Sequence, residues 1–555
     1  MCADMNRAVI FLLVLSLFFS NETVALGNTA TESDSIGITV SLLNHRENDA
    51  FKQRINLAPF NRLNITVRDV PSDIWFIVLQ IHTFQYNATL SYDKALLDKV
   101  ADRGLFGSNI GLYLKTYDVT APIQVFLKHE NVYNLDALLV IVTYGRNAPV
   151  PGGCNMEFDI KVSPYQKLHA ENEMILVDTQ PASILFSNGS SISCEKSPIQ
   201  HKMYRLYLPR QDFTLDTYFD AITRMLTVQD IVQNGDEIPA GTLTSSMRRI
   251  YSAYTGTGSV YATVAIYENY SSAYVPTFTY ACSPLLYPES CKVLNDAFAH
   301  IICALVLIIG CLSIIIGYKY PSIDRSLPNC MIGGILGYTI ALSTGDYSIA
   351  INVLIGSTFA ILAAVISTLL GACMWLRNIS LGFLCTCIIY LYAPAWMFYV
   401  LEHNWLFWPM FISLILATTI LLMTISHVAE IIARAIFGSY FVIVAIDYYT
   451  GSNLKYIIIT IIRRITIPGF NLAFVYPPFQ GADVTLIIVW SVLIAVRFII
   501  QSYTFLCCEK KFTTGLKRNT ETESLLYNYH DDYSTERHIR RSHNQSRYYK
   551  RYIIL

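Results

Sequence analysis

Residues 280–317 read YACSPLLYPESCKVLNDAFAHIICALVLIIGCLSIIIG, and a change of solvent inside this stretch decides the fold class. Up to Asn295 the residues are those of a secreted protein, with paired cysteines, prolines and charges. From Ala297 onward the chain stays apolar for roughly the 20 residues that a helix needs to cross a bilayer. The stretch therefore predicts an ectodomain followed by a membrane domain.

Apolar segments of this kind recur through the C-terminal half of the chain. Their hydropathy predicts a seven-helix α-helical transmembrane domain over residues 296–506 and a polar, disordered cytosolic tail over residues 507–555. Small residues spaced by four on the second and third spans indicate close helix packing, within one bundle or across a dimer face. The expected spans are 297–317, 329–345, 348–374, 379–400, 405–425, 431–449 and 484–506.

The N-terminus sets the expected orientation. Arg7, the apolar run 8–19 and the small-residue exit 25–27 have the layout of a cleaved signal peptide over residues 1–27, with a retained anchor as the alternative. A luminal N-terminus followed by seven spans places the tail in the cytosol. Basic residues gather on the predicted inner side, as the positive-inside rule requires. They are Lys319, Arg325, Arg377, Arg434, Lys510, Lys511, Lys517 and Arg518.

One loop departs from this charge pattern. Residues 449–483 fall on the predicted outside, yet they carry Lys455, Arg463 and Arg464. Inside this loop, residues 456–467 form a short apolar segment closed by a proline. Its shortness and its arginine pair favour an interfacial or re-entrant segment, and an eighth span is the alternative.

The ectodomain shows a period of two, typical of half-buried strands. Short strands at regular spacing predict two β-rich, sandwich-like modules over residues 28–168 and 169–295, stacked on the membrane. A helix is expected over residues 216–226. The expected strands are 36–43, 63–67, 74–82, 111–117, 123–128, 138–144, 156–162, 203–208, 249–254 and 259–267.

Cysteines and sequons place these modules in an oxidising lumen. Four ectodomain cysteines suggest two disulfides with three possible connectivities. The pairing that is local in sequence is favoured, Cys154 with Cys194 and Cys282 with Cys291; a zinc site is the alternative. N-glycosylation is expected at the sequons of Asn64, Asn87, Asn188 and Asn269.

Charged residues within the spans are candidate functional groups because burying them in lipid is costly. Arg497 lies deep in the last span. Glu430 and Arg434 are spaced for a helix ion pair, and with His427 they share one face that invites a metal or proton-relay hypothesis. Asp447 lies at the outer end of the sixth span. A transporter or channel would place these charges along one polar path.

Established enzyme and receptor signatures are missing from the sequence. A zinc-dependent membrane hydrolase needs several membrane-embedded histidines, and the last span has none. The Asp-Arg-Tyr type triplet of rhodopsin-like receptors does not follow the third span, and their Asn-Pro-x-x-Tyr motif does not occur in the seventh. No phosphate-binding or dinucleotide fingerprint occurs either. No catalytic residue, cofactor, metal or nucleic-acid partner is therefore expected.

The tail carries short trafficking patterns. Cys507 and Cys508 are palmitoylation candidates beside the membrane, and nearby basic residues would meet anionic lipid. An acidic dileucine pattern and a C-terminal tyrosine pattern predict sorting adaptors as partners and traffic between the surface and endolysosomes. These patterns consist of Glu521, Leu525 and Leu526, and of Tyr552 and Leu555.

Several local motifs are specific enough to compare with known families: 150–159 (VPGGCNMEFD), 280–282 with Cys291, 438–440 (GSY) and 445–449 (AIDYY). With these motifs the chain resembles the transmembrane 7 superfamily member 3 family, whose membrane domain is similar to that of the transmembrane 198 proteins. The resemblance implies a seven-span glycoprotein linked to cell survival and damping of stress responses. It implies no catalytic residues.

The leading hypothesis is thus a non-enzymatic multi-pass membrane glycoprotein of the secretory pathway, resident at the plasma membrane, in endolysosomes or in both. Its β-rich ectodomain would bind an unknown extracellular or luminal protein, and its bundle and tail would modulate signalling. A transporter or channel using Arg497, Asp447 and Glu430 is the first alternative, and a membrane hydrolase the second.

Overall fold

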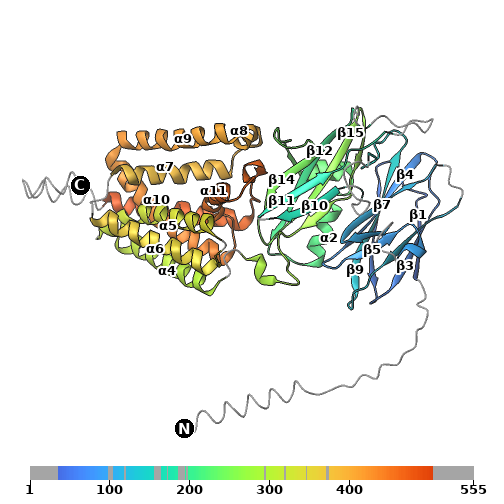
Figure 1. Cartoon of the computed structure of the whole chain (residues 1–555), viewed down its shortest axis with the longest axis horizontal. Coiled ribbons are helices and arrows are strands. Elements are labelled where there is room, and N and C mark those ends of the chain that lie inside the picture. Colours follow the sequence, from blue (N-terminus) through green and yellow to red (C-terminus); the bar gives the residue numbers. More distant parts are fainter. Residues whose placement is uncertain are drawn as a thin grey trace, which may run out of the picture.

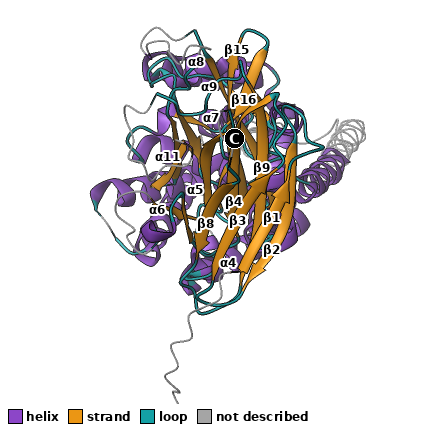
Figure 2. Cartoon of the chain, turned by 90° about the vertical axis from the view of Figure 1, so that its right-hand side faces the viewer, coloured by secondary structure: helices purple, strands orange, loops and turns teal. Residues whose placement is uncertain are grey.

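The computed structural model describes residues 36–97, 104–117, 121–154, 164, 166–171, 173–184, 194, 198–292, 296–317, 320–345, 347–369 and 374–503. Two β-sandwiches stand end to end with a helical bundle (Figure 1). Seen from the ectodomain, the strands lie in front of the helices, so the sandwiches stack on one end of the bundle (Figure 2). The predicted signal peptide, the strand predicted over 156–162, Asn188 and the tail with its sorting and palmitoylation candidates lie outside the described residues.

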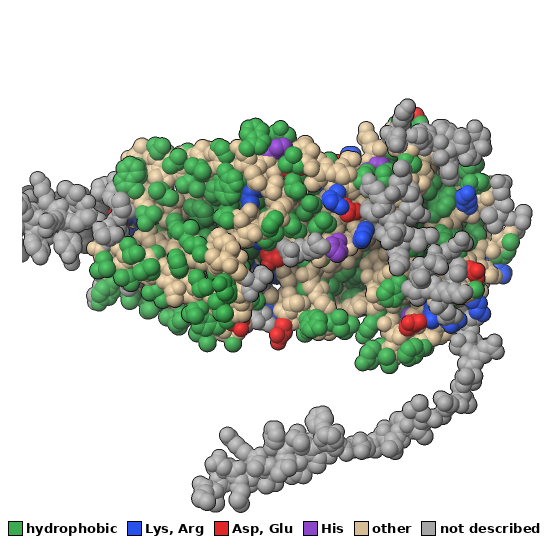
Figure 3. Space-filling model, in the orientation of Figure 1, with side chains coloured by type: hydrophobic (Ala, Val, Ile, Leu, Met, Phe, Trp, Pro, Cys, Tyr) green, Lys and Arg blue, Asp and Glu red, His purple; other side chains and the backbone are tan. Residues whose placement is uncertain are grey.

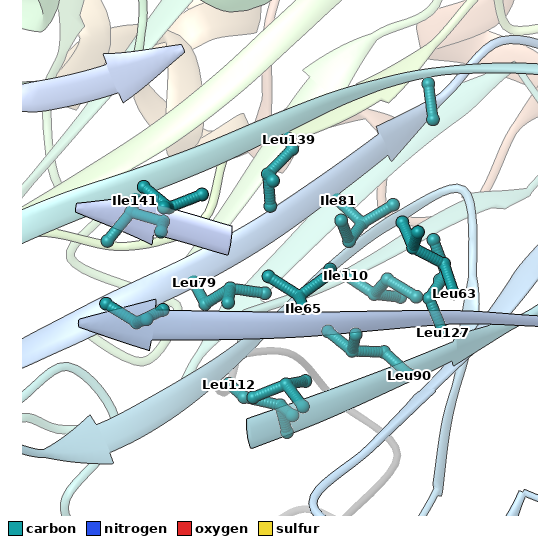
Figure 4. Close-up of a cluster of buried hydrophobic side chains, with 14 of the residues drawn as sticks. Leu63, Ile65, Leu79, Ile81, Leu90, Ile110, Leu112, Leu127, Leu139 and Ile141 are labelled. Carbon is teal, nitrogen blue, oxygen red and sulfur yellow. The ribbon is translucent and has the colours of Figure 1, made fainter. Parts of the chain in front are cut away.

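The first sandwich is built from two sheets. Their facing side chains are mostly leucine and isoleucine, among them Ile65, Leu79, Leu127 and Leu139, and they form a closed core (Figure 4). One sheet has the order β1 (Ile36–Ser41), β3 (Arg62–Arg68), β8 (Ile123–Lys128), β5 (Ala88–Ser91) and β6 (Gly104–Gly107). The other has the order β2 (Ala50–Leu57), β9 (Leu135–Gly145), β4 (Ile74–Thr83) and β7 (Asn109–Lys115).

Strands β4 and β9 are buried on both faces. The inner face joins the first core, while Phe76, Val140 and Tyr144 on the outer face pack into a second cluster with residues of the next sandwich. The Tyr144 hydroxyl accepts from the Ala273 amide at 3.1 Å. Strands covered on both sides read as continuous hydrophobic runs, which is why β9 reads LDALLVIVTYG. The two sandwiches therefore share a core and form one body.

The second sandwich also has two sheets. One has the order β10 (Gln166–Glu171), β11 (Met174–Thr179), β14 (Arg248–Ser252) and β18 (Ala473–Phe474). The other has the order β13 (Asp236–Ile238), β12 (Gln200–Arg210), β15 (Thr257–Tyr267) and β16 (Tyr270–Ala273), with β17 (Thr277–Thr279) paired to β15. Helices α2 (Leu215–Thr223) and α3 (Val228–Asn234) follow β12.

The boundary predicted near residue 168 is wrong. It falls inside β10, which pairs with β11 of the second sandwich. Val150 already forms a bridge with Ser183, and Cys154 is bonded to Cys194. The turn after β9 therefore leads directly into the second sandwich, because its backbone finds partners there and not in the first.

The membrane domain holds seven helices of at least 18 residues among the described residues. They are α4 (Ala297–Ile316), α5 (Pro321–Thr344), α6 (Ile349–Leu369), α7 (Met374–Leu391), α9 (Asn404–Thr424), α10 (Ser426–Thr450) and a last helix, Gly481–Tyr503. Five of them are long and apolar enough to cross a membrane, and a sixth span is obtained when α7 is joined to the bent segment after it. The seventh, α5, packs along α6. Hydrophobic side chains cover much of the visible bundle surface (Figure 3).

Two details of the predicted spans change. The fourth span does not reach residue 400: α7 ends at Leu391, and the chain bends by 103° before the segment Ala395–Glu402, where η5 (Ala395–Met397) runs into α8 (Phe398–Glu402). Pro394 explains the break, since proline disfavours a helical residue before it. The second helix begins at Pro321 rather than 329, so Asp324 is helical.

The small residues of the second and third spans pack against each other. A side chain at Gly333 would meet Ala363, and one at Gly337 would meet Phe359. Both neighbours lie on α6, so the small-residue pattern is used inside the bundle, where it lets α5 and α6 approach closely.

Candidate functional site: the junction of ectodomain and bundle

The loop with the unexpected charges forms a joint between the two halves of the molecule. Its helix, α11 (Tyr456–Thr466), lies at the end of the bundle that faces the sandwiches, here termed the ectodomain end (Figure 1). With 11 residues, α11 is too short for the eighth span considered above. Most of its side chains are buried, so this segment is a structural part of the junction.

Apolar contacts in the junction come from both halves. Tyr254 of the sandwich packs edge-on against Tyr456, with ring centroids 4.8 Å apart. Ile457 and Ile461 of α11 belong to the same buried cluster as Tyr254 and as Leu391 of α7. The hydroxyl of Tyr254 also donates to the carbonyl of Val475. One hydrophobic core therefore continues from the sandwich into the bundle.

The loop after α11 adds a strand to the second sandwich. β18 runs parallel to β14, with Ile250 opposite Ala473 and Tyr251 opposite Phe474. Successive side chains of a strand point to opposite faces. Accordingly, Ile250 and Ala473 join the junction cluster, whereas Tyr251 and Phe474 enter the sandwich core. The membrane domain thus completes a sheet of the ectodomain.

Arg463 ties α11 to the sandwich. Its guanidinium donates to the carbonyl of Ala253 at 2.7 Å and forms an ion pair with Glu173. It lies 5.2 Å from the ring centroid of Tyr456 and is 3% exposed. Because a buried charge needs partners, this arginine favours the docked arrangement over a separated one.

Arg464 ties α11 to the turn between α8 and α9. Its guanidinium donates to the carbonyl of Leu401 at 2.7 Å and to the amide oxygen of Asn404 at 2.8 Å. It also lies over the ring of Phe407, 3.6 Å from the centroid. Two adjacent arginines thus hold one short helix from two sides. Both are buried and partnered, which explains why they depart from the positive-inside pattern.

Lys455 and Asp447 fix the turn that leads into α11. The Asp447 carboxylate accepts from the Lys455 amide at 2.7 Å, and the ammonium group lies 3.7 Å away. Burial lowers the pKa of Lys455 to about 8, against the opposing effect of Asp447. Gly451 ends α10 in a left-handed conformation, φ 79°, which a glycine adopts without strain.

Glu402 forms a second tie, which the sequence did not reveal. It ends α8 and is 1% exposed. Its carboxylate accepts from the amides of Thr242 at 2.8 Å and Leu243 at 2.6 Å, and from the Thr242 hydroxyl at 2.8 Å. Hydrogen bonds to an ionised acceptor are among the stronger ones.

Strand β12 makes a third tie, also missed from the sequence. Arg205 is fully buried, 4.1 Å from the ring centroid of Tyr207, and donates to the carbonyl of Tyr476 at 3.2 Å. Arg210 donates to the carbonyl of Ser452 at 2.7 Å and to Asn453 at 2.9 Å. β12 therefore contacts both sides of the membrane-domain loop.

Comparison with known proteins places this arrangement in a family. Three family models match successive parts of the chain: a TM7SF3-like N-terminal immunoglobulin-like domain at residues 43–144, a TM7SF3-like second immunoglobulin-like domain at 149–285, and a TM7S3/TM198-like domain at 303–502. The chain belongs to the transmembrane 7 superfamily member 3 family. It is 23% identical over 444 residues to transmembrane 7 superfamily member 3 of Homo sapiens, covering 77% of each chain. It is 25% identical over 455 residues to the Rattus norvegicus protein of that name, covering 78% of this chain and 79% of the relative.

The disulfides Cys154–Cys194 and Cys282–Cys291 lie in the second immunoglobulin-like domain and in the segment that follows it. The predicted sequons differ in accessibility. Asn87 and Asn269 are exposed, at the start of β5 and in the turn between β15 and β16, whereas Asn64 is only partly exposed within β3.

The family motif 438–440 docks the last helix onto α10. A side chain at Gly438 would collide with the guanidinium of Arg497. Ser439 accepts from the indole of Trp490 at 3.1 Å, and the ring of Tyr440 lies 5.5 Å from that of Trp490. The glycine is required because the arginine passes directly over it.

Arg497 forms a buried ion pair at the other end of the bundle, here termed the tail end. Its guanidinium lies 2.6 Å from the carboxylate of Asp324, and both side chains are almost fully buried. The hydroxyl of Ser313 donates to the same carboxylate at 2.5 Å. Four helices, α4, α5, α10 and the last one, therefore meet at this pair.

Glu430 belongs to a separate group at the tail end. It pairs with Arg434 one turn along α10 and lies 3.5 Å from Arg377 of α7. The side chain of His427 lies outside the described residues. Glu430 and Asp447 are 17 positions apart on α10; at the α-helical rise this is about 25 Å. Arg497, Asp447 and Glu430 thus each have partners of their own.

Proposed function

We propose that this family member is a non-enzymatic membrane glycoprotein that binds a protein partner with its immunoglobulin-like ectodomain and passes the binding event to its membrane bundle. The observation that carries the proposal is the junction. A sheet shared by both halves, the buried Arg463 and one continuous hydrophobic core join the sandwich to the membrane domain at α11.

A joint of this kind transmits displacement. If the ectodomain served only to hold a ligand, a flexible linker would suffice, and the sandwich could move independently of the helices. Here the sandwich cannot tilt without separating β18 from β14 and exposing Arg463. α11 in turn contacts α7 and α5. A partner that shifts the ectodomain therefore shifts helices within the bilayer.

The direction of transmission follows from the proposed topology, with the ectodomain luminal or extracellular and the tail cytosolic. Two ectodomain disulfides and two exposed sequons support this orientation. The trafficking patterns of the tail would place the protein at the plasma membrane, in endolysosomes or in both. The family resemblance suggests that the output damps stress responses and favours cell survival.

The local partners of the intramembrane charges support this proposal over transport. A transport path would need Arg497, Asp447 and Glu430 to face a shared polar route. Instead Arg497 binds Asp324, Asp447 binds the backbone before α11, and Glu430 binds Arg377 of α7 as well as Arg434. Each charge is used to join two segments of the chain.

Proximity labelling from the ectodomain tests the proposal. The full-length protein with a labelling enzyme at its mature N-terminus is compared with the same protein carrying Arg463→Met, which keeps side-chain length but removes the charge at the junction. Arg224→Met, at an exposed ion pair on α2, is the matched control. We expect one reproducible luminal or extracellular partner with all three proteins, and a stress-survival response that only Arg463→Met loses. Recovering no reproducible partner, or finding full signalling from Arg463→Met, would contradict the proposal.

A further inference from the structure

A cleft lies between the first sandwich and the segment that follows β17. Its volume is about 530 Å³. Tyr86 and Phe106 of the first sandwich line one side, and Phe278, Tyr280 and Leu286 line the other. Phe106 is 54% exposed. Exposed aromatic side chains around a concave site are typical of a surface that is covered by a ligand.

Polar side chains also line the cleft, among them Glu130 and Asn131 of the first sandwich. The cleft therefore favours a ligand that brings both a hydrogen-bonding group and an apolar face.

Asn87 lies at the rim of this cleft. It starts the sequon Asn87-Ala88-Thr89, its side chain is exposed, and it is one of the lining residues. Its backbone carbonyl accepts from the amide of Asn131 at 3.1 Å, which fixes the direction of the loop. In the β5–β6 pair Thr89 stands opposite Phe106. Asn87 immediately precedes β5 and, like Phe106, lines the cleft, so the sequon lies close to this aromatic ring.

We propose that the cleft receives the first sugars of an N-glycan carried by Asn87. The inference rests on the luminal orientation given under the proposed function. N-acetylglucosamine offers apolar C–H faces to Tyr86 and Phe106, and its hydroxyl and acetamide groups can bond to polar lining groups such as those of Glu130 and Asn131. A tethered ligand has a high effective concentration, so it outcompetes a free ligand of similar intrinsic affinity. The glycan would then splint the two sandwiches.

Site-resolved deglycosylation under native conditions tests this. The full-length protein, in membranes from a cell that glycosylates secretory proteins, is digested with a peptide:N-glycosidase, and the remaining glycan at each asparagine is followed by mass spectrometry. Asn269, on an exposed turn, is the internal reference. We expect both sites to be occupied, with release from Asn87 slower than from Asn269 by about tenfold or more. Phe106→Ser should raise the Asn87 rate toward that of Asn269, whereas Val232→Ser, at an exposed position of α3, should leave it unchanged.

Different results separate the two levels of the proposal. If neither site carries a glycan, the luminal orientation fails, and this inference fails with it. If Asn269 is occupied but Asn87 is bare, the cleft is open to a protein partner and the glycan proposal is overturned while the orientation stands. Equal release rates at the two sites, or no effect of Phe106→Ser, would also overturn it.

Discussion

The two ends of the bundle use buried charges in different ways. At the ectodomain end, Arg463, Arg464 and Glu402 each bond to a backbone group of a neighbouring segment in addition to their side-chain partners. At the tail end, Arg497 and Asp324 bond to each other. A backbone partner holds a segment in one place and register, whereas an ion pair clamps helices together. The first end is therefore built as a joint with another domain, and the second as a lock within the bundle.

Helix α10 connects the two ends. It is the most buried of the candidate spans, at 56% of its apolar window. Asp447 at one end fixes the turn into α11, Gly438 at the midpoint contacts the last helix, and Glu430 near the other end pairs with Arg377 of α7. A displacement at the joint thus has a direct mechanical route to the lock.

The largest effect is expected from breaking the lock. Arg497→Met leaves the Asp324 carboxylate buried without its counter-ion and should lower the free energy of unfolding by about 3–5 kcal/mol. Adding Asp324→Asn removes the orphaned charge and should restore most of that loss. Thermal unfolding in detergent micelles measures both. If the double variant is no more stable than the single one, the ion pair is not what joins these helices.

A smaller and local effect is expected at the joint. Arg463→Met removes a charged hydrogen bond to the sandwich and should cost about 1–3 kcal/mol. The change should appear as faster hydrogen exchange in β14 and β18, with α4 and α9 unaffected. Arg224→Met serves as the exposed control. Uniform acceleration across the whole chain would mean that the joint is not a separate unit.

Acidification should lower the free energy of unfolding of the ectodomain through His201, a buried histidine of the second sandwich. Its Nε2 accepts from the Ala182 amide at 3.0 Å, so the ring is neutral, and burial, together with the nearby Arg249 charge, lowers its pKa to about 4. In the unfolded chain the same imidazole has the ordinary histidine pKa of about 6.5, so below that pH the unfolded state binds a proton that the folded state does not. The contribution of the neutral His201 ring to the free energy of unfolding is therefore complete above pH 6.5 and is lost as pH falls toward 4. The loss amounts to about 1–2 kcal/mol at pH 5.

Ectodomain unfolding followed from pH 7 to pH 5 measures this loss. His201→Gln should remove about half of the loss over that range, because burial also lowers the pKa of His82 in the first sandwich to about 4 and that group titrates in the same direction. An unchanged pH profile in the variant would exclude His201 as the titrating group.

The smallest effect is expected from Glu430→Gln. The side chains of Glu430 and Arg434 are partly exposed, at 26% and 18%, so their pairing is partly screened by solvent. We expect a loss below about 1 kcal/mol. The loss of stability is measured by thermal unfolding of Glu430→Gln and Arg497→Met side by side. If the two losses were equally large, the Glu430 group and the Arg497–Asp324 pair would act together.

Much of this architecture can be predicted from the sequence because its signals are local. An apolar run such as 297–316 identifies a span by itself, and alternating residues identify strands such as 74–82. The junction could not be found in this way. β18 has only two residues, and its pairing with β14 is a long-range contact. Asp324, in a predicted loop, gave no sign that it would face Arg497.

Proximity of Ile250 to Ala473 tests the joint most directly. Cysteines placed at these two positions, which stand opposite each other in the β14–β18 pair, should form a disulfide in native membranes, detected as a cross-linked peptide by mass spectrometry. Ile250→Cys with Phe474→Cys is the control, because a shift of one residue points the second side chain to the other face. We predict efficient cross-linking of the first pair and little of the second. Absence of the cross-link in the first pair, or equal yields from both, would contradict a sheet shared between ectodomain and bundle.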